Sequence, residues 1–260
     1  MAGEPLYCGV DVGASATKVV LLDSAGEVSA RVVRKSGVDY DATSRACLDE
    51  ALDGGSVEDV VATVSTGYGR RNVAFAGRAV TEIHCHGVGC HHLIGGAMTV
   101  VDIGGQDNKV INIAGDGKRL DFRMNRKCAA GTGAFIEEIP ARLDVPLAEL
   151  DSLAAGTDEA VRLSSFCTVF AKTEILSHLR AGVPVASIVR GAFLSVVVRV
   201  MEMAQLTGKV VLTGGVAAHN PTVRDILAEQ LEQPVIVPQF PQFTGALGAA
   251  LLAKDDKEKS

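Results

Sequence analysis

The sequence predicts an α/β protein that contains one structural unit twice. Residues 7–23 read as an apolar strand, an aspartate, a glycine-containing turn and a second apolar strand. Residues 99–113 repeat this order of strand, aspartate, glycine turn and strand. Apolar residues at helical spacing lie outside the two units, most clearly over residues 185–206. A repeated hairpin accompanied by helices indicates two related α/β halves.

The segments around the two hairpins predict further strands, helices and a tail. Short apolar runs predict strands at 60–65 and 235–237. Helical spacing predicts helices at 41–52, 167–180, 185–206, 224–231 and 242–253, and two short helical pieces around Pro146 within 144–155. In the last helix, Gly245 and Gly248 predict a close crossing between the two halves. The charged residues 254–260 predict a solvated, disordered tail.

Composition and charge narrow the class of protein. Of the 260 residues, 47% are hydrophobic and 22% are charged, which is typical of a globular chain that buries a large core. The formal net charge of −6 argues against a nucleic-acid-binding surface. Prolines and glycines interrupt the apolar stretch 235–253, which argues against a membrane span. Six scattered cysteines and an N-terminus without an apolar leader predict a reducing, cytoplasmic environment.

The turn of the first hairpin has the composition of a phosphate-binding loop. The N–H groups and hydroxyls of Gly13, Ser15 and Thr17 can surround a phosphate. Asp11 can hold Mg2+ through water, and Lys18 can neutralise phosphate charge. Glycine and serine are also ordinary residues of a hairpin turn, so this loop alone leaves both interpretations open.

Two cysteines stand where helices are predicted to begin. Cys128 precedes a glycine-rich turn and a helix, and Cys167 precedes an amphipathic run for which Thr168 is the expected cap. The free N–H groups of a first helical turn favour thiolate, the form that binds metal. An iron-sulfur cube usually takes four cysteines, so a homodimer with the cube on its two-fold axis would supply two from each subunit. The alternative is that each cysteine packs as a small hydrophobic residue.

Residues 82–92 concentrate histidines and cysteines. Their spacing matches no standard zinc finger, and no second pair follows at a suitable distance. We therefore expect no metal here, with Cys85 and Cys90 packed in the core and His86 hydrogen-bonded locally.

Two further turns are candidates for ligand contact. The turn after the strand at 60–65 can present Thr66 and Arg70 to a cleft, although Arg70 and Arg71 are equally consistent with a solvated pair. In residues 210–221, a Gly-Gly turn between a strand and a helix lets backbone approach a flat ring or a phosphate closely.

The two hairpins, the Gly-Gly-Val turn and a closing Gly-Ala-Leu-Gly-Ala helix resemble, in this order, the ATPase superfamily of actin, Hsp70 and the sugar kinases. The resemblance implies two ribonuclease H-like domains, residues 1–95 with 244–260 and residues 96–243, with ATP and Mg2+ in a cleft between them. It implies a first phosphate loop of Asp11, Gly13, Ala14, Ser15, Ala16, Thr17 and Lys18, a second of Asp102, Gly104, Gly105 and Gln106, and further nucleotide contacts from Gly131, Gly214, Gly215, Val216, Asn220 and Gln242.

Within this superfamily, residues 66–70, 102–107, 127–133 and 167–171 resemble the activators of 2-hydroxyacyl-CoA dehydratases, of the BadF/BadG/BcrA/BcrD type. The resemblance extends over almost the whole chain. It implies that Cys128 and Cys167 bind one 4Fe-4S cluster shared across a homodimer. ATP hydrolysis would then drive a low-potential electron from a reduced ferredoxin or flavodoxin to the dehydratase.

The resemblance also implies catalytic roles. Asp102 would orient Mg2+ or the attacking water, and either Gln106 or Asp107 would position that water. Cys90 and the adjacent His91 and His92 depart from the family pattern.

Two alternatives stay open at the level of sequence. The first is an ATPase subunit of a benzoyl-CoA reductase-type enzyme, against which the Gly-Gly-Gln-Asp form of residues 104–107 favours the separate activator. The second is a small-molecule kinase without a cluster, such as a sugar kinase. A kinase would need a carboxylate base aimed at a substrate hydroxyl and would have no need of Cys128 and Cys167 at two helix starts.

Overall fold

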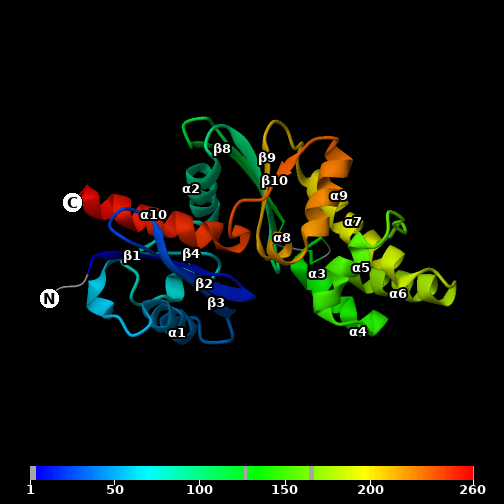
Figure 1. Cartoon of the computed structure of the whole chain (residues 1–260), viewed down its shortest axis with the longest axis horizontal. Helices are drawn as coiled ribbons and strands as arrows, with labels where there is room; N and C mark the ends of the chain where they lie inside the picture. The colour runs from blue at the N-terminus through cyan, green and yellow to red at the C-terminus, as the bar shows by residue number, and fades with distance from the viewer. Residues whose placement is uncertain (1–3, 126–127, 130, 164–166, 260) are drawn as a thin grey trace. The chain divides into compact units, whose positions relative to one another are not determined.

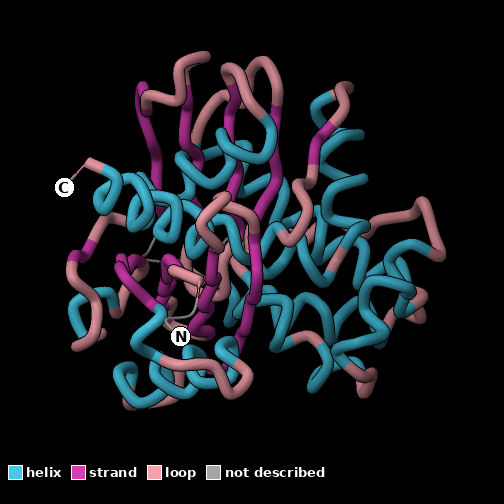
Figure 2. The backbone as a smooth tube through the Cα atoms, turned by 60° about the vertical axis from the view of Figure 1, so that its left-hand side comes forward, coloured by secondary structure: helices cyan, strands magenta, loops and turns pink. Residues whose placement is uncertain are grey.

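The computed structural model describes residues 4–125, 128–129, 131–163 and 167–259. The chain divides into two compact units. The first consists of Met1–Ala97, Ile113–Leu120 and Gln242–Ser260, and the second of Met98–Asn112 and Asp121–Pro241. Each unit contains strands covered by helices, as the tube in Figure 2 shows in magenta and cyan. The predicted α/β class is confirmed.

The first unit is built on a five-stranded mixed sheet in the order β3-β2-β1-β4-β5. Its strands are β1 (Leu6–Val12), β2 (Ala16–Leu22), β3 (Val28–Lys35), β4 (Val60–Thr66) and β5 (Arg78–Ala79). The strands β1, β2 and β3 pair antiparallel, whereas β4 runs parallel to β1 and β5 parallel to β4. The predicted first hairpin is therefore β1 and β2, with Asp11 directly opposite Lys18.

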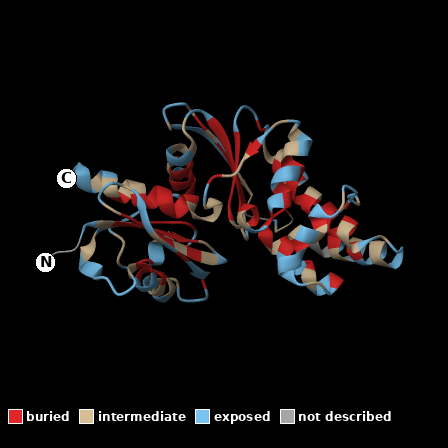
Figure 3. Ribbon diagram, viewed as in Figure 1, coloured by how far each residue is buried: buried red, intermediate tan, exposed pale blue. Residues whose placement is uncertain are grey.

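Helices cover both faces of this sheet (Figure 1). They are α1 (Tyr40–Leu52), α2 (Glu82–Ile94) and α10 (Thr244–Glu258), with short 3-10 turns at Val57–Asp59 and Arg70–Asn72. Because side chains alternate along a strand, Val19 and Leu21 pack with α1, and Val20 and Leu22 pack with α10. Figure 3 shows the resulting buried strands and the buried first half of α10.

Two predictions for this unit need correction. Gly248 of α10 does not serve a crossing between halves, because a side chain there would overlap the carbonyl of Cys85 in α2, within the same unit. Residues 254–258 are not a disordered tail but the last turn of α10, where Lys254 pairs with Glu258 at 2.9 Å. The histidine-rich residues 82–92, for which the sequence predicted no secondary structure, lie within the helix α2.

The second unit contains most of a sheet in the order β10-β9-β6-β7-β8. Its strands are β6 (Met98–Ile103), β7 (Asn108–Ile113), β8 (Arg119–Asn125), β9 (Val210–Thr213) and β10 (Val235–Ile236). β9 runs parallel to β6 and to β10. The predicted second hairpin corresponds to β6 and β7.

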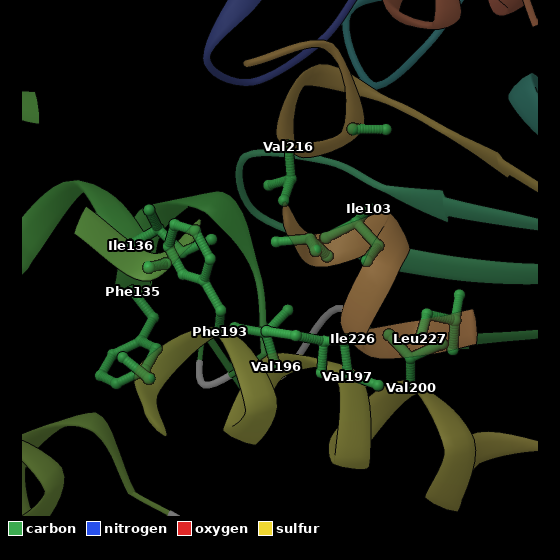
Figure 4. Close-up of a cluster of buried hydrophobic side chains, with 14 of the residues drawn as sticks. Ile103, Phe135, Ile136, Phe193, Val196, Val197, Val200, Val216, Ile226 and Leu227 are labelled. Atoms are coloured by element: carbon green, nitrogen blue, oxygen red, sulfur yellow. The ribbon is translucent and has the colours of Figure 1, made fainter. Parts of the chain in front are cut away.

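Helices of the second unit enclose one large apolar core. They are α3 (Gly133–Glu138), α4 (Pro140–Leu143), α5 (Leu150–Ala155), α6 (Thr168–Arg180), α7 (Val185–Met203), α8 (Gly215–His219) and α9 (Pro221–Leu231), with a 3-10 turn at Leu147–Glu149. A further 3-10 turn, Pro241–Phe243, lies where the chain passes from this unit to the first. Phe193, Val196 and Val200 carry the predicted stripe of α7 into this core, together with Ile103 of β6 (Figure 4). Among the described residues, no helix is both long and apolar enough to cross a membrane.

Candidate functional site

The first hairpin places a carboxylate and an amine together at its turn. Lys18 Nζ lies 3.3 Å from Asp11 Oδ2, and only 7% of the Asp11 side chain is exposed. Asp11 ends an apolar strand and Lys18 lies opposite it, so the pairing follows from strand register. A buried carboxylate with an amine partner at the tip of a hairpin is suited to bind a metal-phosphate group.

The turn between them holds the other predicted residues of the first phosphate loop. Gly13 N–H donates to Ala16 O over 3.0 Å and closes the turn, which leaves Ala14 and Ser15 exposed at its tip. Thr17 is fully buried, and its hydroxyl lies 2.9 Å from that of Ser36. Thr17 therefore offers a ligand its backbone rather than its hydroxyl.

The second hairpin repeats the arrangement with a deeper ion pair. Lys109 Nζ donates to Asp102 Oδ2 over 3.0 Å and to Asp107 Oδ1 over 2.8 Å. Thr213 on the neighbouring strand donates to Asp102 Oδ1 over 3.1 Å. Lys109 and Asp102 are each about 96% buried, since 4% of each side chain is exposed. Asp102 is thus fixed from both sides.

Lys109 is a site residue that the sequence analysis missed. The signal was present, because the lysine follows the aspartate by seven residues in both hairpins, as Asp11 with Lys18 and Asp102 with Lys109. The duplicated unit therefore includes the ion pair as well as the strands.

Gln106 and Asp107 of the second phosphate loop are the two candidates for positioning water, and only Gln106 has a side chain without a protein partner among the described residues. Gly104 N–H donates to Asp107 O over 2.9 Å, so residues 104–107 form a tight turn. The carboxylate of Asp107 is engaged by Lys109. Gln106 is exposed and its side chain has no hydrogen bond within the part of the chain that the structure describes.

The Gly-Gly turn lies directly against Asp102. Gly214 has φ 98°, and a Cβ at this position would overlap Ile103 O and lie 2.9 Å from Asp102 Oδ1. Gly215 begins α8, and Asn220 ends it by donating to Val216 O over 3.1 Å. The Val216 side chain belongs to the core, so its contribution to a ligand is backbone only. Gln242, predicted for the same nucleotide set, lies in the 3-10 turn before α10.

The segment with Cys128 is hydrogen-bonded to the second phosphate loop. Gly133 N–H donates to Gly104 O over 2.9 Å, and Ala134 N–H donates to Gly105 O over 2.8 Å. Cys128 is exposed and precedes Gly133, the first residue of α3, by five positions. The loop that is predicted to bind phosphate thus shares backbone bonds with the helix that follows the cysteine.

Cys167 is the other exposed cysteine. It is the N-cap of α6, and the helix begins at Thr168, so the expectation that Thr168 would cap it is wrong. Cys8, Cys47, Cys85 and Cys90 are buried, which confirms the expectation for Cys85 and Cys90. Burial raises the pKa of the thiols of Cys8 and Cys85 to about 12. The two cysteines with candidate functions therefore differ from the other four in being exposed.

The structure places two predicted residues of the first unit differently. His86 Nδ1 lies 3.0 Å from Thr244 Oγ1 on α10, a partner far away in the sequence. Thr66 is fully buried, so the turn does not present its side chain to a cleft as predicted. Arg70 donates to Gly67 O over 2.9 Å and so closes its own turn. Gly67, with φ 88°, packs against Asp11, and a Cβ there would lie 2.5 Å from Asp11 Oδ1.

The described residues contain no group of three or more histidine, cysteine or acidic side chains arranged around a metal position. A shared site supplied by two subunits would need two ligands from each chain, and both exposed cysteines meet the requirement of an accessible thiol. For Mg2+, both oxygens of Asp102 already have protein partners, so this carboxylate fits a metal ion held through water.

The duplicated hairpin, the two aspartate–lysine pairs and the mixed sheets define a class: ATPases with the fold that actin, Hsp70 and the sugar kinases share. A ROK family glucokinase from Streptomyces griseus superposes with a TM-score of 0.58 at 16% identity, covering 96% of this chain and 99% of its own, which shows the fold alone. The chain belongs to the BadF/BadG/BcrA/BcrD ATPase family, whose sequence model matches residues 8–253.

Relatives cover the chain almost end to end. The activator of lactoyl-CoA dehydratase of Anaerotignum propionicum is 41% identical over 96% of this chain and 98% of its own. The 2-hydroxyisocaproyl-CoA dehydratase activator of Clostridioides difficile is 39% identical over 97% of this chain and 96% of its own. A structure of the activator from that species, with bound ADPNP, superposes with a TM-score of 0.91 at 36% identity and covers 98% of this chain and 96% of its own. The predicted family and the ATPase activity are confirmed.

Proposed function

We propose that this ATPase is the activator of a 2-hydroxyacyl-CoA dehydratase. It acts as a homodimer in the cytoplasm, takes an electron from a reduced ferredoxin or flavodoxin and passes it to the dehydratase. Cys128 and Cys167 of each subunit would hold one shared 4Fe-4S cluster, which supplies a one-electron carrier of low potential when it is bound. One observation carries the proposal. The backbone N–H groups of Gly133 and Ala134, in the segment that follows Cys128, donate hydrogen bonds to the carbonyl oxygens of Gly104 and Gly105.

ATP would be held by the residues that the two hairpins and the Gly-Gly turn present. The turn of residues 13–18 would surround phosphate, with Lys18 as counter-charge. Gly131, Gly214, Gly215, Val216, Asn220 and Gln242 would complete the nucleotide site. The domains would be residues 1–95 with 244–260 and residues 96–243.

Hydrolysis would depend on Asp102 and Gln106. Lys109 and Thr213 hold the Asp102 side chain in one conformation. Asp102 would therefore orient Mg2+ through water without rearranging first. Because Asp107 is engaged by Lys109, we assign the attacking water to Gln106 and a supporting role to Asp107. This assignment separates two residues that the sequence left equivalent.

Coupling requires that ATP and ADP stabilise different arrangements of the cysteine segment, because a ligand with equal affinity for two states shifts neither. Contact of Gly104 or Gly105 with a γ-phosphate would act on Gly133 and Ala134 through the two backbone bonds. Small-molecule kinase activity has support only at the level of the shared fold, since the glucokinase likeness is at 16% identity.

The direct test is ATP-dependent activation. Anaerobically purified protein, reduced ferredoxin or flavodoxin, ATP and an inactive 2-hydroxyacyl-CoA dehydratase are combined, and dehydration of the acyl-CoA is followed. We expect activity with ATP and none with ADP, and loss of activity with Cys128→Ala. Formation of a phosphorylated sugar, with no activation of any dehydratase tested, would instead identify a kinase.

A further inference from the structure

A side chain adds a third connection between the second phosphate loop and the cysteine segment. Asn108 is the first residue of β7 and directly follows the turn of residues 104–107. Its side-chain amide donates to the carbonyl oxygen of Gly131, between Cys128 and the start of α3. Both groups belong to the second unit. The bond therefore spans from the end of the phosphate loop to the loop with the cysteine.

The surroundings of Asn108 indicate that its role is to donate a hydrogen bond from its side-chain amide. It is 1% exposed, and its Oδ1 has no hydrogen-bond partner among the described residues. A buried amide oxygen without a partner is unfavourable, and asparagine is a poor strand residue. An apolar β-branched residue would suit this position better if packing were its only role. The bond to Gly131 is what the asparagine provides.

The acceptor is equally constrained. Gly131 has φ 91°, a conformation that glycine adopts without strain, and a Cβ there would lie 3.0 Å from Arg199 Cβ. On its other side, Thr132 N–H and Oγ1 both donate to Ala129 O, over 3.0 and 2.7 Å. Cys128 N–H donates to Asn125 Oδ1 over 3.3 Å. Cys128 thus lies between an anchor at Asn125 and the anchor that Asn108 supplies.

We propose that Asn108 is a positioning residue that transmits the nucleotide state of the second phosphate loop to the Cys128 loop. The backbone bonds from Gly104 and Gly105 reach α3 itself, whereas Asn108 reaches the loop that precedes it, at Gly131. Displacement of residues 104–107 by a γ-phosphate would move both attachments together. Asn108 touches neither ATP nor the thiol in this account. The inference rests on the proposed function, because it needs a nucleotide bound at this loop.

Hydrogen exchange of the full-length protein, purified anaerobically, tests the proposal. Exchange of the backbone amides of residues 128–132, which precede the amides that bond to Gly104 and Gly105, is compared with Mg-ADP and with the non-hydrolysable analogue Mg-ADPNP. The affinity for each nucleotide is measured separately. In the unaltered protein we expect rates that differ about 3- to 10-fold between nucleotides, the effect of one or two hydrogen bonds on a local opening equilibrium.

Two variants of Asn108 and one control separate the bond from packing. Asn108→Val removes the donor and fills the site, and Asn108→Asp keeps the shape but replaces the donor by a carboxylate oxygen. Both should bring the ratio of rates toward one. Gly131 is the only proposed nucleotide contact that loses a hydrogen bond, so both nucleotide affinities should fall by a similar factor of about 10 or less. Asn112→Val alters an asparagine of the same strand that accepts from Thr99 Oγ1 over 3.0 Å, and it should keep the ratio.

The outcomes distinguish this inference from the proposed function. A nucleotide-dependent ratio that persists in Asn108→Val or in Asn108→Asp overturns the role of Asn108 and leaves the activator proposal intact. Equal exchange with both nucleotides in the unaltered protein, despite tight binding of each, overturns the transmission itself. Failure of the unaltered protein to bind ADPNP contradicts the proposed function instead.

Discussion

Gly133 donates its backbone N–H to the carbonyl oxygen of Gly104 over 2.9 Å. One residue belongs to the turn that is predicted to bind phosphate, and the other begins the helix after an exposed cysteine. A Cβ at Gly133 would lie 3.2 Å from Gly104 O and from Gly105 Cα, so a larger residue would crowd this contact. The nucleotide loop and the cysteine segment are therefore neighbours in the backbone hydrogen-bond network, and the predictions below follow from that relationship.

Asp102→Asn should abolish most ATP hydrolysis and leave the cysteines unaffected. The amide keeps the size of the side chain but loses the negative charge that orients Mg2+ and is paired with Lys109. We expect kcat to fall by at least about 10²-fold, as for the loss of a preorganised electrostatic group. Steady-state phosphate release measures the change, and iron content should match that of the unaltered protein. Full ATPase activity in this variant would contradict the role of Asp102.

Lys109→Met should destabilise the fold by about 3–5 kcal/mol, because it leaves the carboxylates of Asp102 and Asp107 without their buried partner. Urea unfolding measures this loss. Mg2+ should recover more stability in the variant than in the unaltered protein, since the metal ion can supply the missing positive charge. The matched control is Lys118→Met, whose exposed pair with Asp116 should contribute little. Equal stabilities of the two variants would show that the Lys109 pair is dispensable.

Gly214→Ala should be far more damaging than Gly208→Ala. Both glycines have positive φ, 98° and 68°, so both variants carry backbone strain of about 1–2 kcal/mol. Only at Gly214 would the new Cβ overlap Ile103 O and crowd Asp102, whereas at Gly208 it meets open space. We expect Gly214→Ala to weaken nucleotide binding as well as folding. Unfolding by denaturant and nucleotide titration measure the two effects, and a normal affinity in Gly214→Ala would separate this turn from the site.

Thiol reagents should modify two cysteines quickly in the folded, metal-free protein. Cys128 and Cys167 are exposed, whereas the other four cysteines are buried. With a pKa of about 12, Cys8 and Cys85 would be thiolate in only about 10⁻⁴ of molecules at pH 8, and the thiolate is the reactive form. Mass spectrometry of briefly alkylated protein should find label at Cys128 and Cys167. Rapid labelling of Cys8 or Cys85 would contradict the described packing.

The two hairpins that carry the candidate catalytic residues were predictable from sequence because each hairpin is local. An apolar strand, an aspartate and a glycine turn are consecutive residues, and the duplication made Asp11 and Asp102 recognisable as equivalent. Lys109 could also have been predicted, because it follows Asp102 by seven residues, as Lys18 follows Asp11. The prediction of a disordered tail overlooked a local signal, because Lys254 and Glu258 have the i,i+4 spacing that favours a continued helix.

Other features depend on contacts that no local pattern records. The helix α2 contains glycine, histidine and cysteine, which are weak helix formers, and it is held by packing against α10 at Gly89 and Gly248. His86 finds its partner Thr244 158 positions later in the chain. The bond from Asn108 to Gly131 depends on a loop whose path the sequence does not specify. Tertiary packing determines all three.

The central claim is that two cysteines of each subunit hold one iron-sulfur cluster in a homodimer of this ATPase. Iron and acid-labile sulfide content, measured after anaerobic purification together with molecular mass in solution, tests it most directly. The account predicts a dimer with about four irons and four sulfides, by the four-thiolate requirement of a cube, and loss of both in Cys128→Ala and in Cys167→Ala but not in Cys47→Ala. A monomer, or a dimer without iron that still hydrolyses ATP, would contradict it.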